Sequence, residues 1–397
     1  MTPVYRNPSL DMKESATAAA PSAPKSSAES AAPASTPAKA TSRASTTLLV
    51  GLDLGTNTSC LLAEPAGSKD ISLSKIVPSI VGYAKDGLVE GIITNNAQVL
   101  FGEAAFAHRQ QVNLVAPLEN GIIAHREPAR DFLQHLRDLT DASGNATLHA
   151  VIGVPANASV EAREDLCQAV TGLFDRVLLI PEPFLAALGY RDDSRLGQSE
   201  YVDPVVNSLI VDIGGGTTDL CLVQGYFPGP EDQVSIPHAG DAINRQLADL
   251  IERTYPNSGL SRHHIRQLKE AHAYVGPVRK PLEAEVIVGG KTRHIELGEA
   301  IGTVCNAFFD KLYVGVRQLI ARAPSDAVAT TLRNIIVTGG GAQMKGMDTV
   351  LQQRLTEDGY VNPKVRWAGV DYKRHVALGA LKAARSTKEN QWQQLIG

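Results

Sequence analysis

The sequence predicts an α/β protein built from two related halves, and three observations support this prediction. Apolar stretches of strand length alternate with longer stretches of helical periodicity. An apolar strand, an Asp-x-Gly turn with small polar residues and a second apolar strand occur at 48–63 and again at 209–223. A further strand at 334–338 enters a glycine triplet and then a helical stretch at 347–355. Because the Asp-x-Gly pattern recurs at the scale of a domain, we expect two domains of similar architecture.

Length and composition agree with two globular domains. The chain has 397 residues, of which 43% are hydrophobic and 20% charged, and domains usually contain about 100–200 residues. The formal net charge is −4 and no long basic block occurs, so we expect no direct nucleic-acid partner. No apolar stretch reaches the ~18–20 residues of a membrane helix, and the N-terminus lacks a secretory pattern. We therefore expect a cytoplasmic protein with no integral membrane segment.

The four cysteines lie far apart and show no metal-binding or redox spacing. Each one lies in an apolar stretch, which predicts buried free thiols. They are Cys60, Cys167, Cys221 and Cys305.

Residues 1–45 differ in composition from the rest of the chain. From Ser15 to Ser45 the sequence is nearly all Ala, Pro, Ser, Thr and Lys, without aromatic residues or Leu, Ile and Val. Such a segment cannot bury enough apolar surface to offset the entropy lost on ordering. We therefore predict a disordered tail that precedes a globular part beginning at Thr47.

The first Asp-x-Gly turn reads Asp53-Leu-Gly55-Thr56-Asn57-Thr58. Its glycine and small polar residues can present backbone N–H groups and hydroxyls on one side, which suits a phosphate group. Asp53 could act beside a phosphate only through a cation, and a water-shielded Mg²⁺ fits that position. Taken alone, this turn could equally be a plain hairpin with a capping aspartate.

The second turn follows the same scheme with three successive glycines. Glycine lets the backbone approach a ligand closely, at an entropic cost that a purely structural hairpin does not require. Two such hairpins facing each other would hold a polyphosphate from both sides, with Asp212 as a second carboxylate near Mg²⁺. The second set comprises Asp212, Gly214, Gly215, Gly216, Thr217 and Thr218.

The third glycine-rich segment, Gly339-Gly340-Gly341, lies at a junction between a strand and a helix. Small residues there allow close packing against the base or sugar of a nucleotide. A tight turn without a ligand is the alternative for this triplet alone.

These three segments, in this order, resemble the actin, sugar kinase and DnaK-type chaperone superfamily over residues 47–385. The resemblance implies two actin-like (ribonuclease H-like) domains with a nucleotide cleft between them, and ATP with Mg²⁺ as cofactors. The stretches 152–184 and 376–380 resemble the two connections between such domains. The implied domains are 46–200 with a small insertion at about 78–115, 201–374 with an insertion at about 237–299, and 375–397 as a helix that crosses back to the first domain.

The resemblance also assigns roles to individual residues. Residues 265–275 resemble the nucleotide-contacting helix of actin, which places Arg266, Lys269 and Glu270 at the adenosine. Glu182 would polarise the water that attacks the terminal phosphate, with Thr217 orienting the same water and Asp212 with Asp53 holding Mg²⁺ through water. A structural alternative for Glu182 is to cap the helix that follows it.

Within the superfamily, the small first insertion and residues 182–189 resemble MreB and its relatives. Residues 227–234 and 392–395 resemble the MamK group of actins, which organise magnetosomes. The chain departs from eukaryotic actin in its tail and in a first turn without lysine. The resemblance implies an ATP-dependent bacterial actin that forms head-to-tail homopolymers, with slow hydrolysis controlling filament turnover. Magnetosome positioning through organelle-linking adaptor proteins is the implied role.

Other functions in the superfamily stay open at this point. An MreB-like or plasmid-segregating filament would use the same site. A monomeric kinase is disfavoured because no substrate-shaping insertion or general-base aspartate is identified. A DnaK-type chaperone would carry a substrate domain after residue 385, where only a short segment follows.

Overall fold

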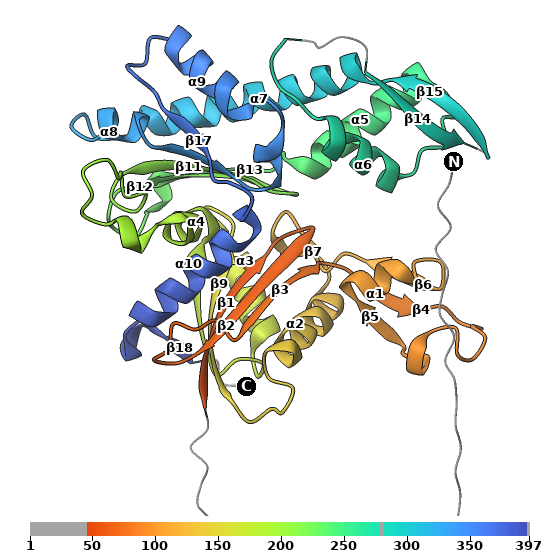
Figure 1. Ribbon diagram of the computed structural model, residues 1–397. Coiled ribbons are helices and arrows are strands. Elements are labelled where there is room, and N and C mark those ends of the chain that lie inside the picture. The colour runs from red at the N-terminus through yellow and green to blue at the C-terminus, as the bar shows by residue number, and fades with distance from the viewer. Residues whose placement is uncertain (1–45, 278–281, 289, 395–397) are drawn as a thin grey trace, which may run out of the picture. The chain divides into compact units, whose positions relative to one another are not determined.

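The computed structural model describes residues 46–277, 282–288 and 290–394. The predicted tail, residues 1–45, lies outside the described residues, as does residue 395, the last of the stretch 392–395 that resembles the MamK group. The described chain contains two larger β-sheets, which Figure 1 shows in the lower and upper parts of the ribbon. We call the elements around these sheets the first half and the second half.

The sheet of the first half has six strands in the order β18-β10-β9-β1-β2-β3. Strands β1, β2 and β3 form an antiparallel meander, whereas β9 and β10 run parallel to β1 on its other side. The bounds are β1 Thr47–Leu54, β2 Thr58–Pro65, β3 Leu73–Pro78, β9 Thr147–Val154, β10 Arg176–Pro181 and β18 Gln393–Gln394.

The sheet of the second half repeats this arrangement with five strands in the order β13-β12-β11-β16-β17. Strands β11, β12 and β13 form the antiparallel meander, and β16 and β17 follow in parallel. The internal repeat predicted from the two Asp-x-Gly turns is therefore confirmed at the level of sheet topology. The bounds are β11 Ser208–Ile213, β12 Thr218–Val223, β13 Gln233–Ile236, β16 Ile335–Thr338 and β17 Val365–Trp367.

Helices cover both sheets, and the helical stretch predicted at 347–355 is confirmed as α9, which ends slightly later. The helices are α1 Gly102–Ala107, α2 Arg126–Thr140, α3 Val160–Val170, α4 Glu182–Tyr190, α5 Gly240–Thr254, α6 Arg262–His272, α7 Gly298–Ile320, α8 Val328–Leu332, α9 Met347–Glu357 and α10 Tyr372–Ser386. Short 3₁₀ helices are η1 Thr94–Asn96, η2 Asp193–Arg195, η3 Pro230–Asp232, η4 Gly340–Gln343 and η5 Glu389–Gln391.

Smaller sheets lie within the stretches predicted as insertions. A three-stranded sheet in the order β5-β4-β6 follows the first meander, and the hairpin β14–β15 lies between α6 and α7. A short hairpin, β7–β8, precedes α2. The bounds are β4 Val81–Ala84, β5 Val99–Phe101, β6 Val112–Val115, β7 Leu118–Glu119, β8 Ile122–Ile123, β14 Glu283–Val288 and β15 Lys291–Glu296.

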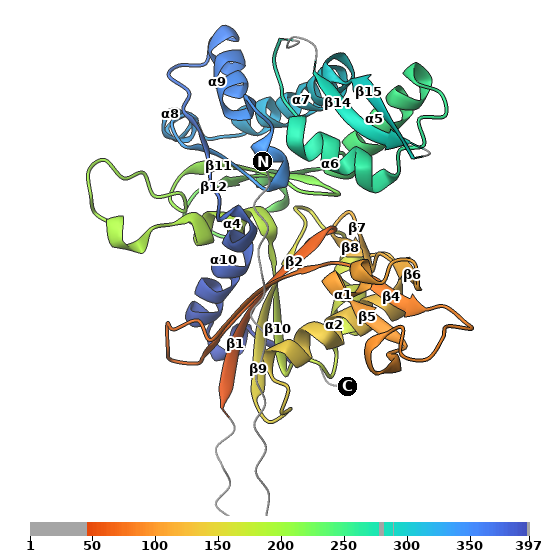
Figure 2. The same cartoon turned by 45° about the vertical axis from the view of Figure 1, so that its right-hand side comes forward.

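Among the described residues, the buried hydrophobic side chains form three clusters. One belongs to the first half and one to the second half. The third joins them, because side chains of β1 and β11, such as Leu49 and Ile210, share a cluster with residues of α4 and α10. Both views of the ribbon show α4 and α10 side by side between the two sheets (Figures 1 and 2).

Helices α4 and α10 cross in direct backbone contact. A Cβ atom on Gly379 would overlap the carbonyl oxygen of Leu185, and one on Gly189 would overlap that of His375. The far end of α10 is fixed by an ion pair, in which Arg385 donates two hydrogen bonds to the fully buried Glu64 of β2. The small-residue crossing helix predicted at 376–380 is thus present.

The cysteine prediction is confirmed for Cys60, Cys221 and Cys305, which are buried and free. It is wrong for Cys167, which is only partly buried because it lies near the exposed edge of α3. Within the part of the chain that the structure describes, no helix combines the length and the apolar character required to cross a membrane.

Replacing Gly379 by alanine is expected to lower the free energy of unfolding by about 1–3 kcal/mol, because the added methyl group separates two helices in backbone contact. Urea unfolding followed by circular dichroism measures the change. Ser386→Ala, at the exposed end of the same helix, serves as the control and should stay within about 0.5 kcal/mol. Equal stability of the two variants would contradict the close crossing.

Candidate functional site

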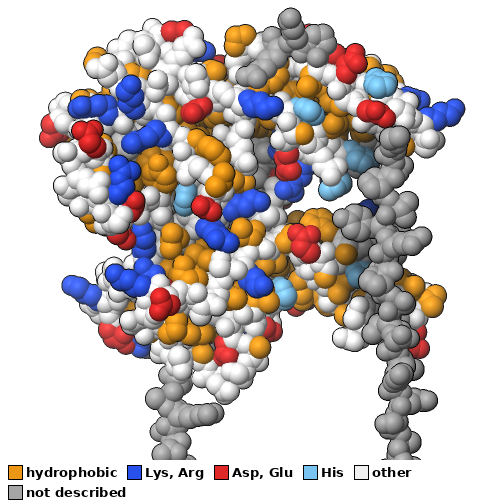
Figure 3. Space-filling view, in the orientation of Figure 1, with side chains coloured by type: hydrophobic (Ala, Val, Ile, Leu, Met, Phe, Trp, Pro, Cys, Tyr) orange, Lys and Arg blue, Asp and Glu red, His pale blue; other side chains and the backbone are white. Residues whose placement is uncertain are grey.

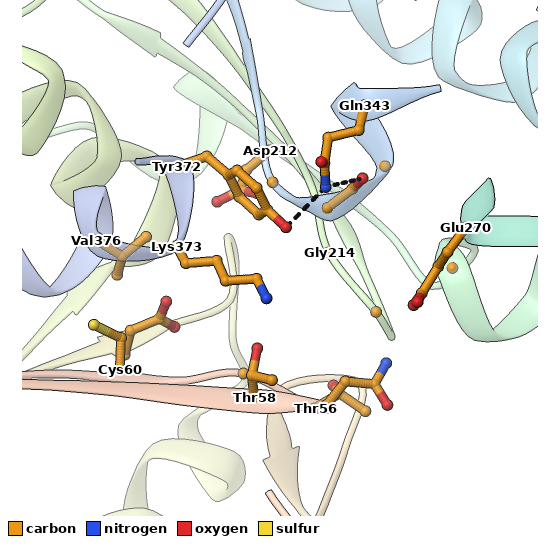
Figure 4. A pocket seen from close by; sticks show the side chains of 18 of the residues that line it. Thr56, Thr58, Cys60, Asp212, Gly214, Glu270, Gln343, Tyr372, Lys373 and Val376 are labelled. Atoms are coloured by element: carbon orange, nitrogen blue, oxygen red, sulfur yellow. Dashed lines mark hydrogen bonds between the residues drawn. The ribbon is translucent and has the colours of Figure 1, made fainter. Parts of the chain in front are cut away.

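A cavity of about 430 Å³ lies where the two halves meet. Figure 3 shows basic and acidic side chains close together along the hollow that crosses the middle of this face. Both Asp-x-Gly turns, the glycine triplet and the helices α4, α6 and α10 contribute to its wall (Figure 4). The lining residues are Asp53, Gly55, Thr56, Asn57, Thr58, Cys60, Ile76, Glu182, Asp212, Gly214, Gly215, Gly240, Arg266, Lys269, Glu270, Ala273, Gly339, Gly340, Gly341, Gln343, Met344, Tyr372, Lys373 and Val376.

The first turn is connected to the second half through Asn57. Its side-chain amide donates to both carboxylate oxygens of Asp241, at 3.1 and 3.3 Å, at the start of α5. Its amide oxygen accepts a hydrogen bond of 3.4 Å from Arg266 of α6. Asn57 therefore links β1–β2 to two helices of the other half across the mouth of the cavity.

The two Asp-x-Gly turns also pack against each other through the tip of the β7–β8 hairpin. The backbone N–H of Gly121 donates to Thr56 Oγ1 at 2.9 Å. A Cβ atom on Gly216 would approach Thr56 Oγ1 and the backbone of Asn120 to within less than 3 Å. A side chain at position 216 would force the tip of the hairpin to shift, because the backbone of Asn120 lies too close.

The glycine triplet lies against the end of β11. Gly339 has a φ of 82°, in the left-handed region that favours glycine. A side chain on Gly339 would collide with Asp212 and the Ile213 carbonyl oxygen. The following η4 helix brings Gln343 to Tyr372 of α10, whose hydroxyl accepts a hydrogen bond of 2.8 Å from the Gln343 amide. This corner of the cavity is therefore built by both halves.

Helix α6 contributes the opposite side of the cavity. Arg266 pairs with Glu270 one turn later, at 2.7 Å, which orients both side chains along the helix face. Lys269 Nζ donates to the Gly240 carbonyl oxygen at 3.2 Å, and burial lowers the pKa of this lysine. Gly240 N–H in turn donates to the Gly214 carbonyl oxygen at 3.2 Å. Helix α6, helix α5 and the second turn are thus one connected unit.

Four carboxyl groups, three of which line the cavity, have pKa values raised by burial. Burial raises the pKa of Asp53 to about 7, and burial together with the charges of Asp53 and Asp219 raises that of Asp212 to about 8. Burial raises the pKa of Asp219 to about 6, against the lowering effect of its hydrogen bonds. Burial and then the charges of Asp53, Asp219 and Asp212 raise the pKa of Glu182 well above its usual value.

The carboxylates of Asp53 and Asp212 suit a cation whose remaining ligands are water molecules and phosphate oxygens. Asp53 and Asp212 line the same cavity from the two halves, and each charge opposes ionisation of the other. Glu182 Oε1 is buried and has no hydrogen-bond partner among the described residues. Within those residues no three His, Cys, Asp or Glu side chains converge on one point. Two carboxylates with water and phosphate oxygens are a common environment for Mg²⁺.

Most of the predicted site residues line the cavity, but Gly216, Thr217 and Thr218 do not. Gly216 forms the packing contact with Thr56. The Thr217 hydroxyl donates to Asp219 at 2.6 Å, and that of Thr218 donates to the His238 carbonyl oxygen at 2.9 Å. The water-orienting role of Thr217 stays a prediction, and its present partner is a carboxylate.

Several lining residues were not anticipated from the sequence. Tyr372, Lys373 and Gln343 reach the cavity only because α10 and η4 meet there, and no local pattern marks them. The β7–β8 hairpin does carry a signal, since Asn120-Gly121 is the dipeptide preferred in two-residue hairpin turns, and both residues have positive φ. That signal predicts the turn but not its contact with Thr56.

Comparison with known proteins identifies the family. The family model for MreB/Mbl protein matches residues 47–389. The actin-like protein MamK of Paramagnetospirillum magneticum is 29% identical over 354 residues, which cover 88% of this chain and 95% of that protein. The cell shape-determining protein Mbl of Bacillus subtilis is 28% identical over 319 residues, which cover 77% of this chain and 88% of Mbl.

Solved structures agree with the sequence comparison. The MamK double helical filament superimposes with a TM-score of 0.76 at 28% identity, covering 86% of this chain and 99% of that chain. The crystal structure of MreB5 of Spiroplasma citri bound to ADP shares the fold, with a TM-score of 0.67. The fold is therefore actin-like, with two related halves around a cavity. The chain belongs to the MreB/Mbl family.

The carboxyl cluster predicts that the nucleotide-free protein loses stability as pH rises. Because the folded pKa values of Asp53 and Asp212 lie above the unfolded value near 4, the folded state holds extra protons between about pH 4 and about pH 8. The stability that these protons provide is complete below pH 4 and disappears as pH passes the folded pKa values. Asp212→Asn should therefore raise the melting temperature at pH 8 and flatten its decline from pH 5.5.

Thermal melts at both pH values, in a buffer without nucleotide or divalent cation, measure this effect. Asp86→Asn changes an exposed carboxylate outside the cavity and is the matched control. A decline with pH that is identical in the two variants would contradict the proposed strain among the buried carboxyl groups.

Proposed function

We propose that this chain binds ATP with Mg²⁺ in the cavity between its halves. The observation that carries the proposal is the convergence of both Asp-x-Gly turns, the glycine triplet and α6 on one cavity. The turns offer backbone N–H groups and hydroxyls to phosphates, and Arg266 with Glu270 offers polar groups to a ribose or base. Mg²⁺ held near Asp53 and Asp212 would neutralise phosphate charge. The MamK structure bound to AMPPNP supports the proposal by its similarity, with a TM-score of 0.61 at 28% identity.

We further propose slow ATP hydrolysis, with Glu182 as the residue that polarises the attacking water. Glu182 lines the cavity at the first position of α4, and its Oε1 atom has no hydrogen-bond partner among the described residues. Positive charge nearby lowers the raised pKa of a buried carboxyl group and so keeps it ionised, and only the ionised form can accept a proton from the attacking water. Asp219, which is 2% exposed, accepts hydrogen bonds from Thr217 and Ala156 and so helps to hold the second turn beside Glu182.

We propose that the loaded protein polymerises head to tail into a cytoskeletal filament. The support is the likeness to the MamK double helical filament, of which this chain covers 99%. The hydrogen bonds of Asn57 with Asp241 and Arg266 connect the two halves beside the cavity, so a bound nucleotide would affect how the halves pack together. The packing of the halves in turn determines the surface that contacts the next subunit. Release of phosphate would then weaken the subunit contacts.

For the cellular role, we propose organisation of magnetosomes or similar organelles, in the cytoplasm and through adaptor proteins. The MamK relatives match a larger share of this chain than the cell shape-determining relatives do, 88% against 77%. The second candidate is an MreB-like role in cell shape, which the family match and the Mbl relative favour.

Right-angle light scattering and electron microscopy test the proposed function directly. Purified protein is mixed with Mg-ATP, Mg-ADP or no nucleotide, and phosphate release is followed in parallel. Filaments that appear with ATP and shorten as phosphate is released are expected. Protein that hydrolyses ATP but stays monomeric would contradict the filament proposal and favour a kinase-like or chaperone-like function.

Glu182→Ala should separate polymerisation from turnover. The variant is expected to form filaments with Mg-ATP, because Glu182 Oε1 forms no hydrogen bond with the described residues, but to release phosphate about 100-fold more slowly. Its filaments should therefore persist after wild-type filaments have disassembled. Glu164→Ala removes an exposed carboxylate of α3 and should behave as wild type. Normal disassembly of Glu182→Ala would remove Glu182 from the mechanism.

A further inference from the structure

The proposed ATP site has an unequal distribution of charge. Its inner end holds the carboxyl groups of Asp53, Glu182 and Asp212, which oppose a polyphosphate. Three basic side chains line the same cavity, namely Arg266, Lys269 and Lys373. The first turn, which carries Thr56, Asn57 and Thr58, supplies no cation.

Two of the three basic groups already have partners. Arg266 bonds to Glu270 at 2.7 Å and to Asn57, and Lys269 Nζ bonds to the Gly240 carbonyl oxygen. Lys373 has neither a hydrogen bond nor an ion pair among the described residues, and its side chain is exposed. The centroid of the Tyr372 ring lies 6.0 Å from its Nζ atom.

The position of Lys373 favours the phosphate end of the cavity. Figure 4 shows its side chain extending from the side of Val376 and Cys60 toward the middle of the cavity, with its end above Thr58 and with Glu270 on the far side. Glu270 marks the end assigned to the adenosine. A flexible lysine on the opposite side can therefore reach the phosphates held by the two turns.

Lys373 also occupies an electrostatically unfavourable place for a purely structural residue. It lies in the first turn of α10, which has no acidic residue and whose N-cap, Asp371, makes no side-chain cap hydrogen bond. Arg374 follows directly. Cations at a helix N-terminus are disfavoured by the helix dipole, so an anion bound nearby would stabilise this arrangement.

We propose that Lys373 binds the terminal phosphates of the nucleoside triphosphate and supplies the cation that the first turn lacks. This inference depends on the proposed function, because it assumes a nucleotide in the cavity. Lys373 lies on α10, the helix that crosses between the halves. Its bond to the phosphate would therefore make the position of α10 depend on whether that phosphate is bound. Lys373 is a binding residue in this role, and Glu182 keeps the contact with the attacking water.

The test is a comparison of ligands that differ in phosphate number. Dissociation constants for Mg-ATP, Mg-ADP and adenosine are measured by isothermal titration calorimetry on the full chain, at a concentration where it is monomeric. Lys373→Ala and Lys373→Gln are expected to weaken ATP binding about 10- to 100-fold, the range for a lost hydrogen bond to a charged group. Adenosine binding should change less than about threefold, and Lys373→Arg should restore most of the affinity for ATP.

Arg374→Ala is the matched control, since it removes the same charge from the same helix turn but from a side chain that does not line the cavity. It should weaken ATP binding less than about threefold. Equal losses for ATP and adenosine in Lys373→Ala would overturn the proposal by assigning Lys373 to the base or to the fold. Equal losses of ATP affinity in Lys373→Ala and Arg374→Ala would overturn the proposed phosphate contact, because they would show only a general effect of positive charge near the cavity.

Wild-type protein separates this inference from the proposed function. If the wild type binds no ATP, the proposed function fails and this inference with it. If the wild type binds ATP and Lys373→Ala binds it equally well, only the role of Lys373 is overturned. Melting curves of the variants without nucleotide show whether they are folded, and Lys373→Gln preserves much of the side-chain volume.

Discussion

The packing of α4 against α10 between the two sheets is the constraint on which the rest of the structure depends. Gly189 and Gly379 bring the two helix backbones into contact, and side chains of both sheets complete the shared hydrophobic cluster. Each helix also delivers residues to the cavity, because α4 begins at Glu182 and α10 begins at Tyr372. The same contact therefore holds the halves together and sets the distance between their turns. A larger residue at Gly189 or Gly379 would therefore disturb both the packing of α4 against α10 and the geometry of the cavity.

The carboxyl cluster shows how this arrangement stores electrostatic strain. Asp53 and Asp212 end equivalent strands of the repeated sheets, so the internal symmetry itself places two carboxyl groups face to face. Desolvation makes their ionisation costly, and a cation with an anionic ligand relieves that cost. The carboxyl cluster therefore lowers the stability of the unliganded protein. Binding of a cation and its anionic ligand removes that unfavourable contribution and so stabilises the folded state.

The sequence predicted the parts of this molecule that depend on local chemistry. The repeated Asp-x-Gly turns predicted the two sheets, and the helical pattern at 347–355 predicted α9, whereas α1, α2 and α8 carried no prediction. The exceptions depend on distant parts of the chain. Cys167 lies in an apolar stretch but near an exposed helix edge, and Lys373 has no motif because its place in the cavity follows from where α10 crosses. The Asn57–Asp241 bond joins residues that no pattern relates.

Helix α10 unites these features, because its two ends are held by charges of different kinds. At its last turn Arg385 is fixed to Glu64, a carboxylate with no exposed surface in the first half. At its first turn Lys373 and Arg374 lie beside the N-cap residue Asp371, and the helix dipole disfavours cations there. A rigid helix that is anchored at one end and carries exposed basic side chains at the other responds to a ligand at the free end. A phosphate at Lys373 would favour one position of α10 and, through the contact with α4, one distance between the halves. Loss of that phosphate would remove the preference without breaking the anchor at Glu64, so the two halves could reopen around a crossing that stays intact.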